Sequence, residues 1–334
     1  MSDKSSQRSE FSIGTRKSKL ALIQVDLIIQ ALQKTFPHYK FTVDSRDTAG
    51  DRNKVTPLSQ FGGKNLWTEE LEQLLVDREI DFVVHSLKDV PTLIPESCAL
   101  ASSPLREDPR DVLVVKKGLP YKSLDDLPAG SVVGTSSVRR TALLARHYPH
   151  LKVENVRGNI ETRLNKCDSN ELPYTAIIVA AAGLLRTGFA DRITQYLDSK
   201  NGKMYHAVGQ GALGIEIRAD DAQMREMFDV MGDLKTTYAS LAERNLLRTL
   251  EGGCSAPLGV ETEWVANESG SGEVLRLRSI VCSVDGKEAV EVEMDKAVAS
   301  KEQAEQFGYE VAEELRKKGA GKILEEIAQS KKPW

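Results

Sequence analysis

Short strand-like runs and helical stretches alternate along the first two thirds of the chain. The first pair is a strand-like run at 11–14 followed by a helix whose apolar face comprises Leu20, Ile23, Leu27, Ile28 and Ala31. Apolar runs predict further strands at 81–84, 111–115, 131–134, 152–156 and 176–180. Because strands joined by helical crossovers form sheets with helices on their faces, this pattern predicts the α/β class.

The last hundred residues follow a different pattern. A helix is expected from Thr236 to about Leu250, and apolar and polar residues then alternate as in an antiparallel sheet over 258–264, 274–284 and 289–294, with a turn at 270–272. Helical spacing returns at 301–317 and 322–329. This part of the chain is therefore expected to form a smaller α+β domain.

Composition excludes some classes of function. Of the 334 residues, 40% are apolar and 28% are charged, which is ordinary for a globular protein of two or three domains. The formal net charge is −4, and no basic run with interleaved aromatic residues occurs, which argues against a nucleic-acid partner. No apolar run reaches 18 residues and the first ten residues are polar, so we expect no membrane segment and a cytoplasmic protein.

Cysteine and histidine are sparse and scattered. The four cysteines, Cys98, Cys167, Cys254 and Cys282, contain no CxxC pair, which argues against a zinc site or a disulfide framework and favours a reducing compartment. The five histidines form no metal-binding pattern, so no metal is expected.

Arginines recur, mostly just beyond predicted strand ends and beside glycine, serine or threonine. The six are Arg16, Arg139, Arg140, Arg157, Arg163 and Arg186. A guanidinium keeps its charge and pairs with carboxylates through its planar fork, so these residues predict a site for a polycarboxylate or polyphosphate. Neither a phosphate-binding G-x-x-x-x-G-K-[ST] loop nor a G-x-G-x-x-G motif is found, which argues against a nucleotide.

Polar residues follow the buried strand at 81–84. Ser86, Lys88 and Asp89 stand at its carboxyl end, where open α/β sheets bind ligands. Asp89 could alternatively serve only as a helix N-cap.

Two glycine-rich segments are candidates for movement. The long polar loop at 47–65 is a candidate lid. In 207–217, three glycines around Gln210 indicate either a hinge between domains or a strand that a ligand approaches closely.

One thiol has unusual neighbours. Gly252 and Gly253 precede Cys254 and remove side chains from its flank, and Pro257 stiffens the chain after it. An isolated cysteine is most often a small buried apolar residue, but these neighbours favour a thiol that a bulky group approaches on a loop.

Seven motifs together resemble one known family, the hydroxymethylbilane synthases, also called porphobilinogen deaminases. The motifs lie at 13–18, 85–89, 134–140, 157–164, 180–184, 208–214 and 251–255 and span nearly the whole chain. Members of this family are transferases of haem and porphyrin biosynthesis. The resemblance implies the head-to-tail condensation of four porphobilinogen molecules with loss of ammonia, followed by hydrolytic release of the linear tetrapyrrole hydroxymethylbilane.

The resemblance also implies roles for individual residues. Cys254 would carry a covalent dipyrromethane cofactor through a thioether, and Asp89 would be catalytic and also contact this cofactor. The other residues implied to bind the cofactor are Ser86, Lys88, Thr135, Ser136, Ser137, Arg139, Arg140 and Arg163. Those implied to bind substrate are Arg16, Ser18, Arg157, Arg186 and Gln210.

For the architecture, the resemblance implies two α/β domains similar to periplasmic binding proteins and a smaller C-terminal α+β domain that carries the cysteine. The expected domains are 1–106 with 209–232, 107–208, and 233–334. The protein is expected to be a monomer whose partner is its small-molecule substrate.

Two alternatives are open on the residues alone. A two-domain binding protein for carboxylate or phosphate would explain the arginines but not the glycine-flanked Cys254 or a third domain. A cysteine acyltransferase or hydrolase would use the thiol, but no histidine lies near Cys254 in the sequence.

Overall fold

The chain divides into two compact units. The computed structural model describes residues 8–48, 68–250, 256–267, 270 and 272–330. Of the described residues, one unit holds those of 8–48, 68–106 and 212–237, and the other holds those of 107–211, 238–250 and 256–330. Cys254 and most of the predicted lid at 47–65 lie outside the described residues. In the described part of the chain, none of the helices has the length and apolar character needed to cross a membrane.

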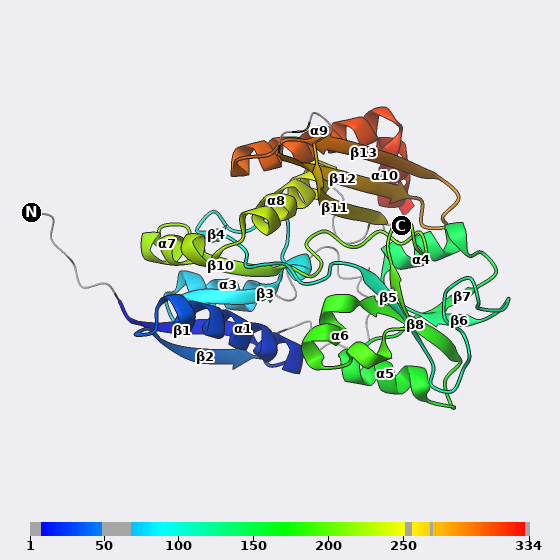
Figure 1. Ribbon diagram of the computed structural model, residues 1–334, viewed down its shortest axis with the longest axis horizontal. Coiled ribbons are helices and arrows are strands. Elements are labelled where there is room, and N and C mark those ends of the chain that lie inside the picture. The colour runs from blue at the N-terminus through cyan, green and yellow to red at the C-terminus, as the bar shows by residue number, and fades with distance from the viewer. Residues whose placement is uncertain (1–7, 49–67, 251–255, 268–269, 271, 331–334) are drawn as a thin grey trace, which may run out of the picture. The chain divides into compact units, whose positions relative to one another are not determined.

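A five-stranded mixed sheet organises the first unit (Figure 1). Its order is β2-β1-β3-β10-β4. The strands are β1 (Glu10–Arg16), β2 (Lys40–Arg46), β3 (Phe82–Ser86), β4 (Cys98–Leu100) and β10 (Leu213–Arg218). β1 runs parallel to both β2 and β3, whereas β10 runs antiparallel to β3 and β4. The sheet is therefore completed by a strand that comes from far along the chain.

Helices cover both faces of this sheet. The apolar sides of α1 (Lys19–Thr35) and α7 (Ala222–Met231) pack on one face, in a core that includes Phe82 and Phe228. On the other face, α3 (Glu69–Val76) packs against Val83 and Cys98. A short 3-10 helix, η2 (Leu87–Asp89), follows β3 directly.

The second unit contains a sheet of the same design. Its order is β7-β6-β8-β5-β9, with β5 antiparallel to its neighbours. The strands are β5 (Asp111–Val115), β6 (Val132–Gly134), β7 (Lys152–Glu154), β8 (Tyr174–Ala180) and β9 (Gln195–Leu197). The helices are α4 (Val138–His147), α5 (Ile160–Asp168), α6 (Ala181–Thr187) and the 3-10 helix η3 (Ala190–Arg192). Successive residues of β5 enter opposite cores, because both faces of the sheet are covered.

The second unit also holds a three-stranded antiparallel sheet (Figure 1). Its strands are β11 (Leu258–Ala266), β12 (Glu273–Cys282) and β13 (Ala289–Lys296). α8 (Leu234–Thr249), α9 (Lys301–Lys317) and α10 (Ala320–Ser330) contribute to one core with this sheet. Gly308 of α9 lies against the Ala242 carbonyl of α8, so a side chain at this position would prevent the two helices from approaching each other.

The predicted fold class is confirmed: two α/β sheets and a smaller C-terminal α+β part are present. Most predicted elements are found, and α9 has the predicted bounds. β2 and α7 were not predicted, and β2 is a largely exposed strand without a continuous apolar face. The alternative role of Asp89 as an N-cap is wrong, because Asp89 is the last residue of η2. The division into three domains at the stated boundaries remains a prediction.

One buried carboxyl group works against the stability of the first unit. Glu72 of α3 is 4% exposed, and its Oε1 has no hydrogen-bond partner among the described residues. Burial raises the pKa of Glu72, and the charge of Glu216 adds to the shift. The folded protein therefore favours the protonated acid. Stability falls as the pH rises from the ordinary value of 4.5 through the higher folded pKa.

The substitution Glu72→Gln is therefore expected to raise the free energy of unfolding by about 1 kcal/mol at pH 8, because glutamine cannot ionise. Urea unfolding at several pH values measures this, and the gain is expected to shrink as the pH falls toward 4.5. Glu70→Gln, on the exposed side of the same helix, is the control and should change little. An equal gain for Glu72→Gln at both ends of the pH range would contradict the explanation.

Candidate functional site

Predicted site residues of the first unit gather at one edge of its sheet. β1 and β3 are parallel neighbours, so Arg16 at the end of β1 and Ser86 at the end of β3 lie on the same edge. Arg16 Nη1 is 3.8 Å from Asp89 Oδ2. The Arg16 and Asp89 side chains are 23% and 32% exposed, so the pair is accessible from solvent. This edge therefore presents a guanidinium and a carboxylate side by side.

Two serines on this edge have different roles. Ser18 is the N-cap of α1, and its Oγ accepts a hydrogen bond from the Ala21 amide at 3.3 Å. Ser86 Oγ accepts a hydrogen bond from Gln24 Nε2 at 2.9 Å. Gln24 is a buried residue that sequence reasoning missed, although a polar residue within the apolar stripe of α1 was a visible signal. Lys88 lies next to Asp89 in η2 and is partly exposed.

In the second unit, the three hydroxyl residues before α4 do not act alike. Ser137 is the N-cap, and its Oγ accepts from the Arg140 amide. Thr135 Oγ1 accepts from the Ser137 amide at 3.2 Å, while Ser136 donates to the Val156 carbonyl at 3.2 Å. Only Ser137 therefore caps the helix, and the other two hydroxyls fix the turn that leads into it.

Arg139 and Arg140 are buried in the first turn of α4 and converge on one carboxylate. Arg139 Nη1 lies 2.8 Å from Asp111 Oδ2, and it also donates to the Tyr205 carbonyl. Arg140 donates to both oxygens of Asp111, at 3.0 Å from Nε and 2.6 Å from Nη2. The two guanidiniums therefore carry one more positive charge than Asp111 neutralises.

The segment before β10 binds the same carboxylate. Gln210 Nε2 donates to Asp111 Oδ1 at 2.8 Å and to the Pro109 carbonyl at 2.7 Å. Gly211 has a φ of +85°, and a Cβ there would collide with the Glu107 carbonyl, so only glycine suits this turn. In the segment 207–217, a turn that contains Gly211 leads into the strand β10. Its predicted role, as a hinge or as a strand that a ligand approaches closely, stays a prediction.

Of the remaining predicted arginines, Arg157 precedes α5, Arg163 lies within α5, and Arg186 lies in the last turn of α6. Arg163 Nε donates to the Gly158 carbonyl at 2.7 Å, which ties α5 to the turn that follows Arg157. Arg186 Nη2 donates to the Gly211 carbonyl at 2.8 Å. The Arg186 Nε is buried and has no hydrogen-bond partner among the described residues, and burial lowers the pKa of this guanidinium. Arg186 can therefore accept an anionic partner.

The described cysteines are poor nucleophiles. Cys98, Cys167 and Cys282 are buried free thiols, and burial raises the pKa of each to about 12. A thiol with such a pKa is protonated at neutral pH and does not react readily. Cys254 lies outside the described residues. Within the described ranges, no cluster of His, Cys, Asp and Glu could hold a metal ion.

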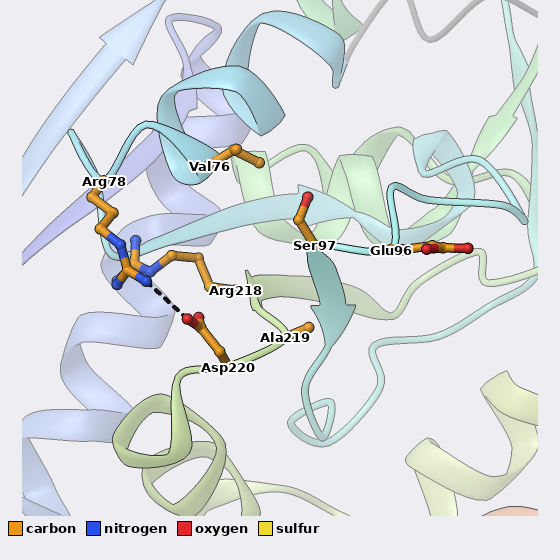
Figure 2. A pocket seen from close by; sticks show the side chains of 7 residues that line it. All are labelled: Val76, Arg78, Glu96, Ser97, Arg218, Ala219 and Asp220. Carbon is orange, nitrogen blue, oxygen red and sulfur yellow. Dashed lines mark hydrogen bonds and ion pairs between the residues drawn. The ribbon is translucent and has the colours of Figure 1, made fainter.

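A pocket of the first unit lies away from these residues (Figure 2). It is lined by Val76, Arg78, Glu96, Ser97, Arg218, Ala219 and Asp220. Arg218 ends β10, which runs antiparallel to β3, so the pocket lies at the opposite end of the sheet from Ser86. Its two arginines lie beside Asp220, and Arg78 pairs with Asp220 at 2.8 Å. None of the predicted site residues contributes to it.

Comparison with known families gives two matches that cover most of the chain. The model described as "Porphobilinogen deaminase, dipyromethane cofactor binding domain" matches residues 11–226. The model described as "Porphobilinogen deaminase, C-terminal domain" matches residues 237–317. The chain therefore has both parts that this family combines, in the same order.

Curated relatives match over nearly their whole length. Proteins named porphobilinogen deaminase are 50% identical to this chain in Neurospora crassa, Yarrowia lipolytica and Saccharomyces cerevisiae. The matches cover 98%, 97% and 94% of this chain and 96%, 95% and 96% of the respective relatives.

Solved structures that overlap with the chain are more distant. They include the methionine-binding protein MetQ, with 13% identity, a TM-score of 0.40 and coverage of 71% of this chain and 96% of that one. The aliphatic sulphonate-binding protein SsuA from Escherichia coli has 13% identity, a TM-score of 0.37 and coverage of 74% and 72%.

Proposed function

This chain belongs to the porphobilinogen deaminase family, and we propose that it is a transferase that joins four porphobilinogen molecules head to tail and releases hydroxymethylbilane. Each condensation breaks the bond between the aminomethyl carbon and ammonia, forms a carbon–carbon bond to the next pyrrole and releases a proton from that pyrrole. The final step adds water. The observation that carries the proposal is 50% identity to relatives of this name along nearly the whole chain.

The residues of the described chain fit a cofactor that carries several carboxylates. The evidence is the excess positive charge of Arg139 and Arg140 over Asp111. When bound, dipyrromethane supplies a pyrrole carbon to which the first substrate is joined. We assign its covalent attachment to Cys254, because the other three thiols are buried and protonated.

Asp89 is the proposed catalytic residue. Departure of ammonia leaves positive charge on the pyrrole ring of the substrate, and a carboxylate next to the ring nitrogen stabilises that charge. The guanidinium of Arg16 forms an ion pair with this carboxylate at 3.8 Å at the edge of the sheet. The same carboxylate can accept the proton that is lost when the two pyrroles join.

The remaining polar residues are assigned by the kind of group they can bind. Each pyrrole brings two carboxylates, and like charges a few ångströms apart repel by on the order of 1 kcal/mol or more per pair even where water screens them. Guanidiniums and hydroxyls offset this repulsion. We assign Ser86, Lys88, Thr135, Ser136, Ser137, Arg139, Arg140 and Arg163 to the cofactor. We assign Arg16, Ser18, Arg157, Arg186 and Gln210 to the incoming substrate.

The intact mass of the purified protein tests the proposal. The expected mass exceeds that of the 334-residue chain by two porphobilinogens less their ammonia. Cys254→Ser should lack this addition and produce no hydroxymethylbilane. Cys282→Ser is the matched control, since it removes a buried thiol and should keep the addition. An active enzyme that weighs no more than its chain would refute the proposal.

We further propose a cytoplasmic monomer that binds neither membrane nor nucleic acid. The three free buried thiols suit a reducing compartment, and the net charge of −4 disfavours binding to nucleic acid. Light scattering coupled to gel filtration measures the oligomeric state, and a mass of about 37 kDa is expected from the 36.9 kDa chain.

A further inference from the structure

Asp111 is a fully buried carboxylate that binds several of the residues assigned to the cofactor and substrate. It begins β5, its side chain is fully buried, and each of its oxygens accepts two hydrogen bonds. Oδ1 binds Arg140 Nη2 and Gln210 Nε2, while Oδ2 binds Arg139 Nη1 and Arg140 Nε. A carboxylate has about four acceptor positions, so no capacity remains for a ligand. Asp111 can therefore act only through the groups that it holds.

The groups it holds are three residues assigned to binding. Arg139 and Arg140 are assigned to the cofactor and Gln210 to the substrate, and they come from positions 28, 29 and 99 residues away in the sequence. Arg140 also donates from Nη1 to the Ile178 carbonyl at 2.8 Å, so its guanidinium plane is fixed from two sides. Three of its five N–H groups are thereby used, and the others can meet a further acceptor.

Electrostatics explains why a carboxylate is needed here. Arg139 and Arg140 lie in the first turn of α4, which contains no acidic residue. The positive end of the helix dipole is at this end of the helix, so it repels both guanidiniums. Burial lowers the pKa of Arg139, and the charge of Arg140 beside it lowers it further. Burial would also raise the pKa of Asp111, but the two guanidiniums outweigh it and hold that pKa well below its usual range. Asp111 therefore stays ionised and neutralises one of the two charges.

We propose that Asp111 is a positioning residue for cofactor assembly and substrate binding, because it orients Arg139, Arg140 and Gln210 while leaving one positive charge for a ligand carboxylate. This inference rests on the proposed function and adds to it a residue that contacts no ligand. If Asp111 had a purely structural role, its replacement would lower stability but leave the affinity for ligands unchanged.

The variant Asp111→Asn tests this inference in the full-length protein. Three quantities are measured: the midpoint of urea unfolding, the fraction of molecules that carry the cofactor by intact mass, and KM and kcat for porphobilinogen. Misplaced guanidiniums are expected to lower the loaded fraction and to raise KM roughly tenfold per loaded enzyme, since the loss of one hydrogen bond to a charged ligand group weakens binding by about that factor.

Asp168→Asn is the matched control. Asp168 lies in the same unit and binds both ends of the Arg192 guanidinium at 2.9 Å, but it touches none of the assigned residues. The substitution Asp168→Asn should lower stability without changing the fraction of molecules that carry the cofactor or the KM for porphobilinogen.

If Asp111→Asn does not fold, Asp111→Glu replaces it, since glutamate keeps the charge and displaces the carboxylate by one methylene. A raised KM then supports the inference. Wild-type loading and KM in the variant that folds would overturn the inference and leave the proposed function intact. Absence of the cofactor mass from the active wild type would instead refute the proposed function.

Discussion

The substitution Asp89→Asn is expected to lower kcat by about a hundredfold or more, the range that positioned acids and bases contribute. Asparagine keeps the shape of the side chain but cannot stabilise positive charge on a pyrrole ring or accept a proton. Product formation per loaded enzyme measures the effect, with the loaded fraction taken from intact mass. The change in kcat should exceed the change in KM, because Asp89 acts mainly on the transition state.

Asp44→Asn provides a matched control in the same unit. Asp44 pairs with Arg46 at 2.8 Å and its side chain is 35% exposed, compared with 32% for Asp89. Its replacement removes the same charge from a similar surface environment and should leave kcat unchanged. If both variants had the same kcat as the wild type, the catalytic role of Asp89 would be refuted.

The substitution Phe82→Ala is expected to have the largest effect on stability, a loss of about 3–5 kcal/mol. Phe82 is fully buried in β3, and its ring meets that of Phe228 edge to face at a centroid distance of 5.0 Å. Alanine would leave a cavity between the sheet and α7 that the surrounding side chains cannot fill. Urea unfolding followed by circular dichroism measures the change.

The comparison variant is Tyr309→Ala, which removes an aromatic ring that is 44% exposed on α9. A loss within about 0.5 kcal/mol is expected there, as for most surface substitutions. Similar losses for the two variants would show that burial of the Phe82 ring does not determine the stability of the sheet.

Local patterns in the sequence were sufficient for much of the fold. The strands β5 and β8 were predicted because covered strands in a sheet are apolar on both faces, and α9 was predicted because its apolar residues recur at helical spacing. β2 was not predicted, since a largely exposed strand needs no apolar side. Polar residues at strand ends also indicated Arg16 and Asp89 as separate candidate site residues, and in the structure their side chains lie 3.8 Å apart.

The amino-acid sequence by itself determined which segments form helices and strands and which chemical groups follow the strand ends, because both depend on neighbours within a few residues. Only the tertiary structure decided which polar groups bind one another. Asp111 is an ordinary strand residue in the sequence, yet it meets Arg140 and Gln210 across 29 and 99 residues. Such partners are set by how the strands are ordered and by the tendency of buried polar groups to form hydrogen bonds, and neither leaves a local pattern in the chain.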